Sequence, residues 1–102
     1  MLDGGSEMKT LDEIALAAKP LLEKYGLLGA TVFGSYARGE QTEASDIDMV
    51  VDVGEGVKPR SVLAFAWELG KKLGMDVDAY GSNELVPGGV VWCAAAEQGV
   101  RL

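Results

Sequence analysis

The residues of this chain best suited to chemistry are aspartates placed two apart. Asp46 and Asp48 form one pair, and Asp76 and Asp78 form another. Because successive side chains of a strand point to opposite faces, each pair would project both carboxylates from one face. Two such carboxylates repel each other unless a cation lies between them, and their oxygens suit Mg²⁺. If the two strands are neighbours, a third carboxylate joins the first pair, and a site for two metal ions becomes feasible.

A glycine–serine step precedes the first aspartate pair by ten residues. Gly34 has no Cβ, so its backbone could approach a bulky anion closely. Backbone amides at the start of a turn or helix, together with the Ser35 hydroxyl, would then bind a triphosphate. Arg38 has two interpretations, as a phosphate ligand or as an ion-pair partner of Glu40 or Glu43.

The composition of the chain excludes several kinds of catalytic site, metal site and binding partner. The chain has 102 residues, a formal net charge of −7, no histidine and one cysteine, and its sequence pI is about 4.4. Without histidine, zinc sites with His ligands, Ser-His-Asp triads and Cys-His dyads are excluded. Without a second cysteine there is no disulfide within the chain, which favours a reducing compartment. The negative charge argues against non-specific nucleic-acid binding and fits a basic protein partner or a small anionic substrate accompanied by divalent metal.

The elements that must position these residues follow from periodicity and capping signals. Thr10 and Glu13 form a capping box that starts a helix, in which Pro20 predicts a kink or a division into two short helices. The pattern then predicts strands at Ala30 to Phe33, Asp46 to Val53 and Met75 to Tyr80, and helices at Ser61 to Leu73 and Val90 to Gln98.

The aromatic side chains could serve either binding or packing. Tyr36 could stack on a base or pack against the loop. Trp67 and Trp92 are expected to pack in or beside the core, and an exposed Trp92 would indicate an interface.

Gly34-Ser35, ten further residues and then Asp46-Ile47-Asp48 together resemble the signature of the polymerase-β-like nucleotidyltransferase superfamily. The fuller string GSYARGEQTEASDIDMVV is similar to the minimal nucleotidyltransferase branch of that superfamily. Val77-Asp78-Ala79-Tyr80 resembles the segment that holds the third carboxylate of the family, although Ala79-Tyr80 replaces the usual apolar pair. The resemblance spans roughly residues 10 to 102 and implies an α/β domain of polymerase-β-like fold, with a small mixed sheet and helices packed against it.

The resemblance also implies a role for each matching residue. Asp46, Asp48 and Asp78 would bind two Mg²⁺ or Mn²⁺ ions, and Asp78 would also act as the general base. Gly34 and Ser35 would bind the phosphates of an NTP, ATP being the expected one, with Arg38 nearby. Asp76 competes with Asp78 as the third carboxylate, and Asp78 is favoured.

Members of this branch pair with a helical HEPN-domain protein in toxin–antitoxin modules, where the nucleotidyltransferase is the antitoxin and can adenylylate its partner. The resemblance therefore implies transfer of AMP to a protein hydroxyl. The alternative is a binding module that masks its partner without catalysis. Residues 1–9 are expected to form a flexible leader and residues 10–102 a single domain. No apolar stretch is long enough to cross a membrane and no signal peptide is evident, so a cytoplasmic location is expected.

Overall fold

A computed structural model describes residues 10–39 and 46–102, apart from the side chains of Ser35 and Arg38. The leader predicted for residues 1–9 lies outside this range. Four strands form one mixed sheet in the order β3-β2-β1-β4. The strands are β1 (Leu27–Phe33), β2 (Ile47–Val53), β3 (Val77–Gly81) and β4 (Val100–Arg101). β1 runs antiparallel to β2 and β4, and β2 runs parallel to β3. The α/β fold with a small mixed sheet is therefore confirmed.

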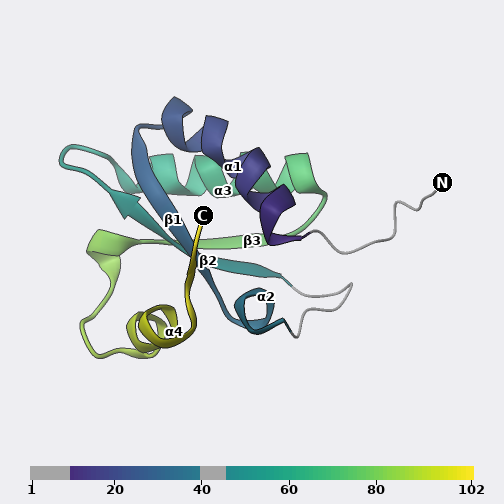
Figure 1. The fold of residues 1–102 in the computed structure, drawn as a ribbon. Coiled ribbons are helices and arrows are strands. Elements are labelled where there is room, and N and C mark those ends of the chain that lie inside the picture. Colours follow the sequence, from purple (N-terminus) through teal and green to yellow (C-terminus); the bar gives the residue numbers. More distant parts are fainter. Residues whose placement is uncertain (1–9, 40–45) are drawn as a thin grey trace.

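Helices α1 (Leu11–Lys24) and α3 (Pro59–Leu73) lie side by side on one face of the sheet (Figure 1). The α4 helix (Val90–Gln98) and the one-turn α2 (Ser35–Arg38) lie on the other side. The core is formed between the sheet and the first helix pair, where Ile47, Met49 and Val51 of β2 are fully buried. These three residues alternate with Asp48 and Val50, as the two faces of the strand predicted at Asp46 to Val53 require. In the part of the chain that the structure describes, no helix is both long and apolar enough to cross a membrane.

The α1 helix begins where its capping box predicts. The Thr10 hydroxyl accepts a hydrogen bond from the Glu13 backbone at 3.1 Å, and the Glu13 carboxylate accepts one from the Thr10 backbone at 3.0 Å. Of the two outcomes expected at Pro20, a kink or a division into two helices, the division is wrong, because one helix runs through it from Leu11 to Lys24. Pro20 and Leu16, whose carbonyl loses its helical donor, both lie on the exposed side of α1. Water can satisfy that carbonyl, so the helix continues at a moderate cost.

Several other boundaries differ from the sequence-based expectation. The α3 helix starts at Pro59, two residues before the predicted start at Ser61, because proline is well suited to the first helical turn. The first strand begins at Leu27 rather than Ala30. The 3₁₀ turn η1 (Ser82–Glu84) and β4 were not expected, and α2 was expected only as a turn or helix start of unstated length at Ser35. An element of two to four residues is too short to show a period, so tertiary contacts decide whether it forms.

Candidate active site

The aspartates gather on the face of the sheet opposite α1 and α3. Asp48 of β2 is directly paired with Asp78 of β3 in the parallel register and with Phe33 of β1 in the antiparallel register. Gly34 follows Phe33 at the end of β1, and Asp46 immediately precedes β2. Three neighbouring strands therefore bring the glycine turn and the carboxylates to one end of the sheet, as the sequence pattern predicts.

Gly34 lies against the carboxylate of Asp48. Its φ is +78°, and a Cβ built on it would lie 2.8 Å from Asp48 Oδ2. A side chain at this position would therefore meet both backbone strain and a steric clash. Only glycine allows the turn to come this close to the aspartate, which places the backbone of α2 next to the carboxylates.

The electrostatics of Asp48 indicate that the carboxylates are close enough to repel one another. Partial burial raises the pKa of the Asp48 carboxyl above its usual value, and the negative charges of Asp78 and then Asp46 raise it further. Each effect disfavours the ionised form. A divalent cation between these groups would relieve the repulsion, and their hard oxygen donors suit Mg²⁺ or Mn²⁺. Asp46, Asp48 and Asp78 thus have the chemistry to hold such an ion.

The carboxylates are not drawn together as tightly as a bound ion would require. Among the described residues, no group of three acidic, cysteine or histidine side chains is gathered closely enough to hold a metal. Asp46 and Asp78 are exposed, whereas Asp48 is half-buried. Metal binding by this set would require the exposed carboxylates to turn toward Asp48.

Asp76 occupies a different place from Asp78. It precedes β3, and its backbone carbonyl accepts a hydrogen bond from the Ile47 backbone at 3.0 Å. Its side chain is exposed. The charges that raise the pKa of Asp48 come from Asp78 and Asp46. Asp78 is thus the carboxylate of β3 that faces Asp48 and interacts with it.

The α2 turn carries Ser35 and Arg38, whose side chains lie outside the described part, as do Glu40 and Glu43. Tyr36 of the same turn is 1% exposed, and its hydroxyl contacts the sulfur of Met75 at 3.5 Å. Its ring therefore belongs to the core and is not available to stack on a base. Its burial anchors α2 beside the sheet.

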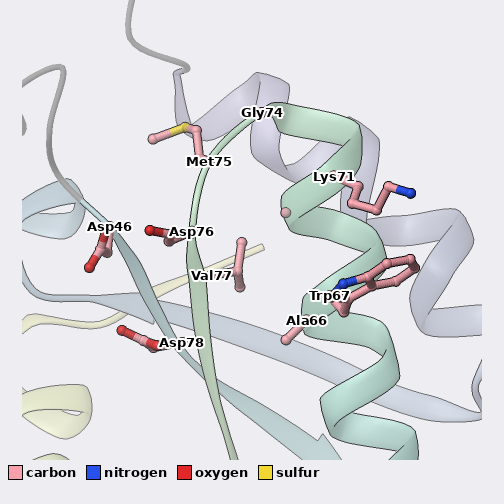
Figure 2. A pocket seen from close by; sticks show the side chains of 10 residues that line it. Asp46, Ala66, Trp67, Lys71, Gly74, Met75, Asp76, Val77 and Asp78 are labelled. Atoms are coloured by element: carbon pink, nitrogen blue, oxygen red, sulfur yellow. The ribbon is translucent and has the colours of Figure 1, made fainter.

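A groove of about 690 Å³ opens beside the aspartates, at the outer edge of β3 (Figure 2). Asp46, Asp76 and Asp78 point to one side of β3, and Trp67 and Lys71 of α3 lie on the other.

Trp67 is 66% exposed, so its expected packing in or beside the core is wrong. Its spacing on α3 does not match the buried stripe, a signal that the sequence already contained. Trp92 is also partly exposed, the condition under which the sequence suggested an interface.

Two further features of this sheet face were not predicted. The ring centroids of Phe33 and Tyr80 are 6.1 Å apart, beside the row that contains Asp48 and Asp78. Arg101 of β4 forms an ion pair with Asp52 of β2. The strand alternation places Tyr80 on the same face as Asp78 and could have revealed it. No signal in the sequence links Arg101 to Asp52.

The sequence of the chain matches a known family over most of its length. A family model described as "Nucleotidyltransferase domain" matches residues 14–91. The chain belongs to this nucleotidyltransferase family. The matched segment contains Gly34 and the carboxylates Asp46, Asp48 and Asp78, so the site lies within the domain that defines the family.

Individual relatives narrow the family to its minimal branch. A protein of Methanocaldococcus jannaschii whose name assigns it protein adenylyltransferase activity is 42% identical over 77 residues, which cover 76% of this chain and 83% of the relative. The protein adenylyltransferase MntA of Thermococcus cleftensis is 39% identical over 85 residues, covering 79% of this chain and 86% of the relative.

Solved structures agree with these sequence relatives. A minimal nucleotidyltransferase superposes with a TM-score of 0.77 at 28% identity, covering 96% of this chain and 100% of that one. A toxin–antitoxin crystallised with AMP-PNP superposes with a TM-score of 0.70 at 27% identity, covering 84% of this chain and 69% of the other. The polymerase-β-like fold, the minimal nucleotidyltransferase branch and the nucleotidyltransferase class of enzyme are thereby confirmed.

Proposed function

We propose that this chain transfers AMP from ATP to a hydroxyl group of a partner protein, and that the partner is a HEPN-type toxin. The observation that carries the proposal is that Gly34, at the end of β1, lies against Asp48 of β2, which is paired with Asp78 of β3, within a nucleotidyltransferase domain. The relatives named protein adenylyltransferase support AMP as the group transferred. The similar toxin–antitoxin complexes, one with AMP-PNP and one with a HEPN toxin, support the nucleotide and the partner.

Each residue of the site has a role in this proposal. The backbone of Gly34 and Ser35, with the Ser35 hydroxyl, binds the triphosphate. Arg38 neutralises part of its charge. Asp46, Asp48 and Asp78 would hold two Mg²⁺ or Mn²⁺ ions, which when bound supply positive charge against the charge developing on the triphosphate.

The transfer itself requires one bond to form and one to break. The acceptor oxygen bonds to the α-phosphorus of ATP, while the bond from that phosphorus to the oxygen bridging to the β-phosphate breaks. Pyrophosphate leaves with the electron pair, and the acceptor proton passes to the Asp78 carboxylate. Asp78 suits this task because it is exposed beside the groove, where an acceptor can approach.

A double substitution tests the proposal. Asp46→Asn with Asp48→Asn should abolish transfer of label from α-labelled ATP to a co-purified HEPN-type partner and leave the complex intact on size exclusion. Glu23→Gln with Glu55→Gln removes the same two charges from exposed positions away from the site and should transfer normally. If the aspartate variant still neutralises the toxin without transferring label, the chain is a masking module and not an adenylyltransferase in this role.

A further inference from the structure

The β3 strand has a free edge beside the proposed active site. Within the described residues it pairs only with β2, in parallel register. Ile47 of β2 donates its N–H to the Asp76 carbonyl at 3.0 Å, so the backbone groups of Asp76 face β2. Because the N–H and C=O of one strand residue point to the same side and alternate from residue to residue, those of Val77 and Ala79 face away from β2. Gly81, next in that alternation, donates its N–H to Glu84 at 3.4 Å, which closes the edge at its far end.

The groove runs along this edge and has an apolar wall. Ala66, Trp67 and Gly70 of α3 line it opposite the start of β3. A Cβ on Gly70 would lie 2.7 Å from the Met75 carbonyl oxygen, so this glycine allows α3 to approach the strand closely. The Lys71 ammonium lies 4.4 Å from the Trp67 ring centroid, on the rim. An exposed tryptophan beside an open strand edge is a suitable contact for an apolar side chain.

A strand added to this edge would present its side chains to two different surroundings. Figure 2 shows the Asp78 carboxylate on the side of β3 away from α3, whereas Val77 points toward the helix. Because side chains alternate, a residue opposite Asp78 would point to the carboxylate side. Its two neighbours would point to the side that carries Trp67. One extended segment could thus place a hydroxyl at Asp78 and anchor itself on α3.

The charges beside the free edge of β3 indicate which charge an added segment should carry. Asp46 and Asp76 are exposed at the same end of the groove, and the whole chain carries a net charge of −7. Lysine or arginine two positions from the hydroxyl residue would lie on the same side as these carboxylates. An acidic segment would be repelled.

We propose that the acceptor protein docks by adding an extended, basic, hydroxyl-bearing segment as an antiparallel strand to the free edge of β3, with apolar side chains against Trp67. The inference rests on the proposed function, since it specifies how the acceptor of that reaction is held. The residues that flank the hydroxyl residue then exchange backbone hydrogen bonds with Val77 and Ala79.

Backbone methylation of a peptide tests the strand pairing without altering the protein. The probe is a fluorescein-labelled peptide with the central sequence Lys-Val-Tyr-Val-Lys, and its dissociation constant is measured by fluorescence polarisation. N-methylation of both valines removes donors that would face β3 and should weaken binding at least about tenfold. N-methylation of both lysines is the matched control, because their N–H groups would face away from β3, and it should change binding by less than about twofold.

Two substitutions test the apolar wall. Trp67→Ala should weaken peptide binding about tenfold, since the side chain is exposed and its loss leaves the core unchanged. Leu16→Ala, which removes another exposed apolar side chain, from α1, should leave peptide binding unchanged.

Equal effects of the two methylated peptides, no binding at millimolar peptide, or full binding by Trp67→Ala would overturn the docking inference. Label transfer to the HEPN-type partner in the same preparation would then show that the proposed function survives. Binding as expected without any transfer to that partner would instead refute the proposed function.

Discussion

The two faces of the sheet differ in what they contribute to the protein. The face under α1 and α3 carries fully buried side chains such as Ile47, Met49 and Val51. The opposite face of the same strand carries Asp48, whose charge is disfavoured by burial and by its neighbours. One strand thus contributes one set of alternate residues to the core and places Asp48, a residue of the proposed site, on the other face. The comparison indicates that the negative charges of Asp78 and Asp46 oppose the ionisation of Asp48, so this charge works against the stability that the covered face supplies.

The largest effect on stability is expected on the covered face. Met49 is fully buried in the core, so Met49→Ala should lower the free energy of unfolding by about 2–5 kcal/mol. Urea unfolding followed by circular dichroism measures this change. Val51→Ala and Val50→Ala remove the same two methyl groups from adjacent positions on opposite faces, and the cost should be larger for Val51, which is fully buried, than for Val50, which is 6% exposed. Equal costs would remove the distinction between the two faces.

A substitution in the turn at Gly34 should have the second-largest effect on the free energy of unfolding. Gly34→Ala would place a Cβ at positive φ and 2.8 Å from Asp48 Oδ2, which should cost about 1–3 kcal/mol. Label transfer should also fall, because the backbone can relax only by moving away from the carboxylates. Gly56→Ala is a matched control at φ +80° with nothing within 4 Å of the added Cβ. The backbone strain is common to both variants, so the difference between them measures the contact with Asp48.

The smallest effect on stability is expected at Asp48, where the substitution should stabilise the protein instead of destabilising it. Asp48→Asn removes the repelled charge and should raise the melting temperature at neutral pH by a few degrees at most, while transfer is lost.

The pH dependence of this effect follows from the raised pKa. The folded protein holds the Asp48 proton more tightly than the unfolded chain, whose reference pKa is 3.8. The wild type therefore loses stability as the pH rises from that value through the folded pKa. The advantage of Asp48→Asn should be largest at neutral pH and disappear below the unfolded pKa. Calorimetric scans from acid to neutral pH measure it, and an advantage that grows toward acid would contradict the electrostatic account.

The covered face of the sheet and the main helices could be predicted from the sequence because their apolar residues recur at regular spacing. The alternation of Ile47, Met49 and Val51 and the capping box at Thr10 both correspond to observed elements. The glycine–serine signature likewise located the end of β1 and the aspartate pair. These features depend on local patterns that a single segment contains.

The remaining features depend on contacts between distant segments. The pairing of Arg101 with Asp52 and the burial of Tyr36 against Met75 arise only when the chain has folded. Pro20 was expected to kink or divide α1, and the division is wrong, because the sequence does not show that the freed carbonyl faces water. The groove at β3 could not be predicted either, since it requires α3 and the strand edge to be placed together.

The central claim, that Asp78 completes the active site with Asp46 and Asp48, is tested most directly by comparing two aspartates of one segment. Asp78→Asn and Asp76→Asn remove the same charge two residues apart, beside the same groove. In label transfer from α-labelled ATP to the HEPN-type partner, Asp78→Asn should lower the rate at least about a hundredfold, while Asp76→Asn should retain most of it. A larger loss in Asp76→Asn, or equal losses in both, would contradict the assignment.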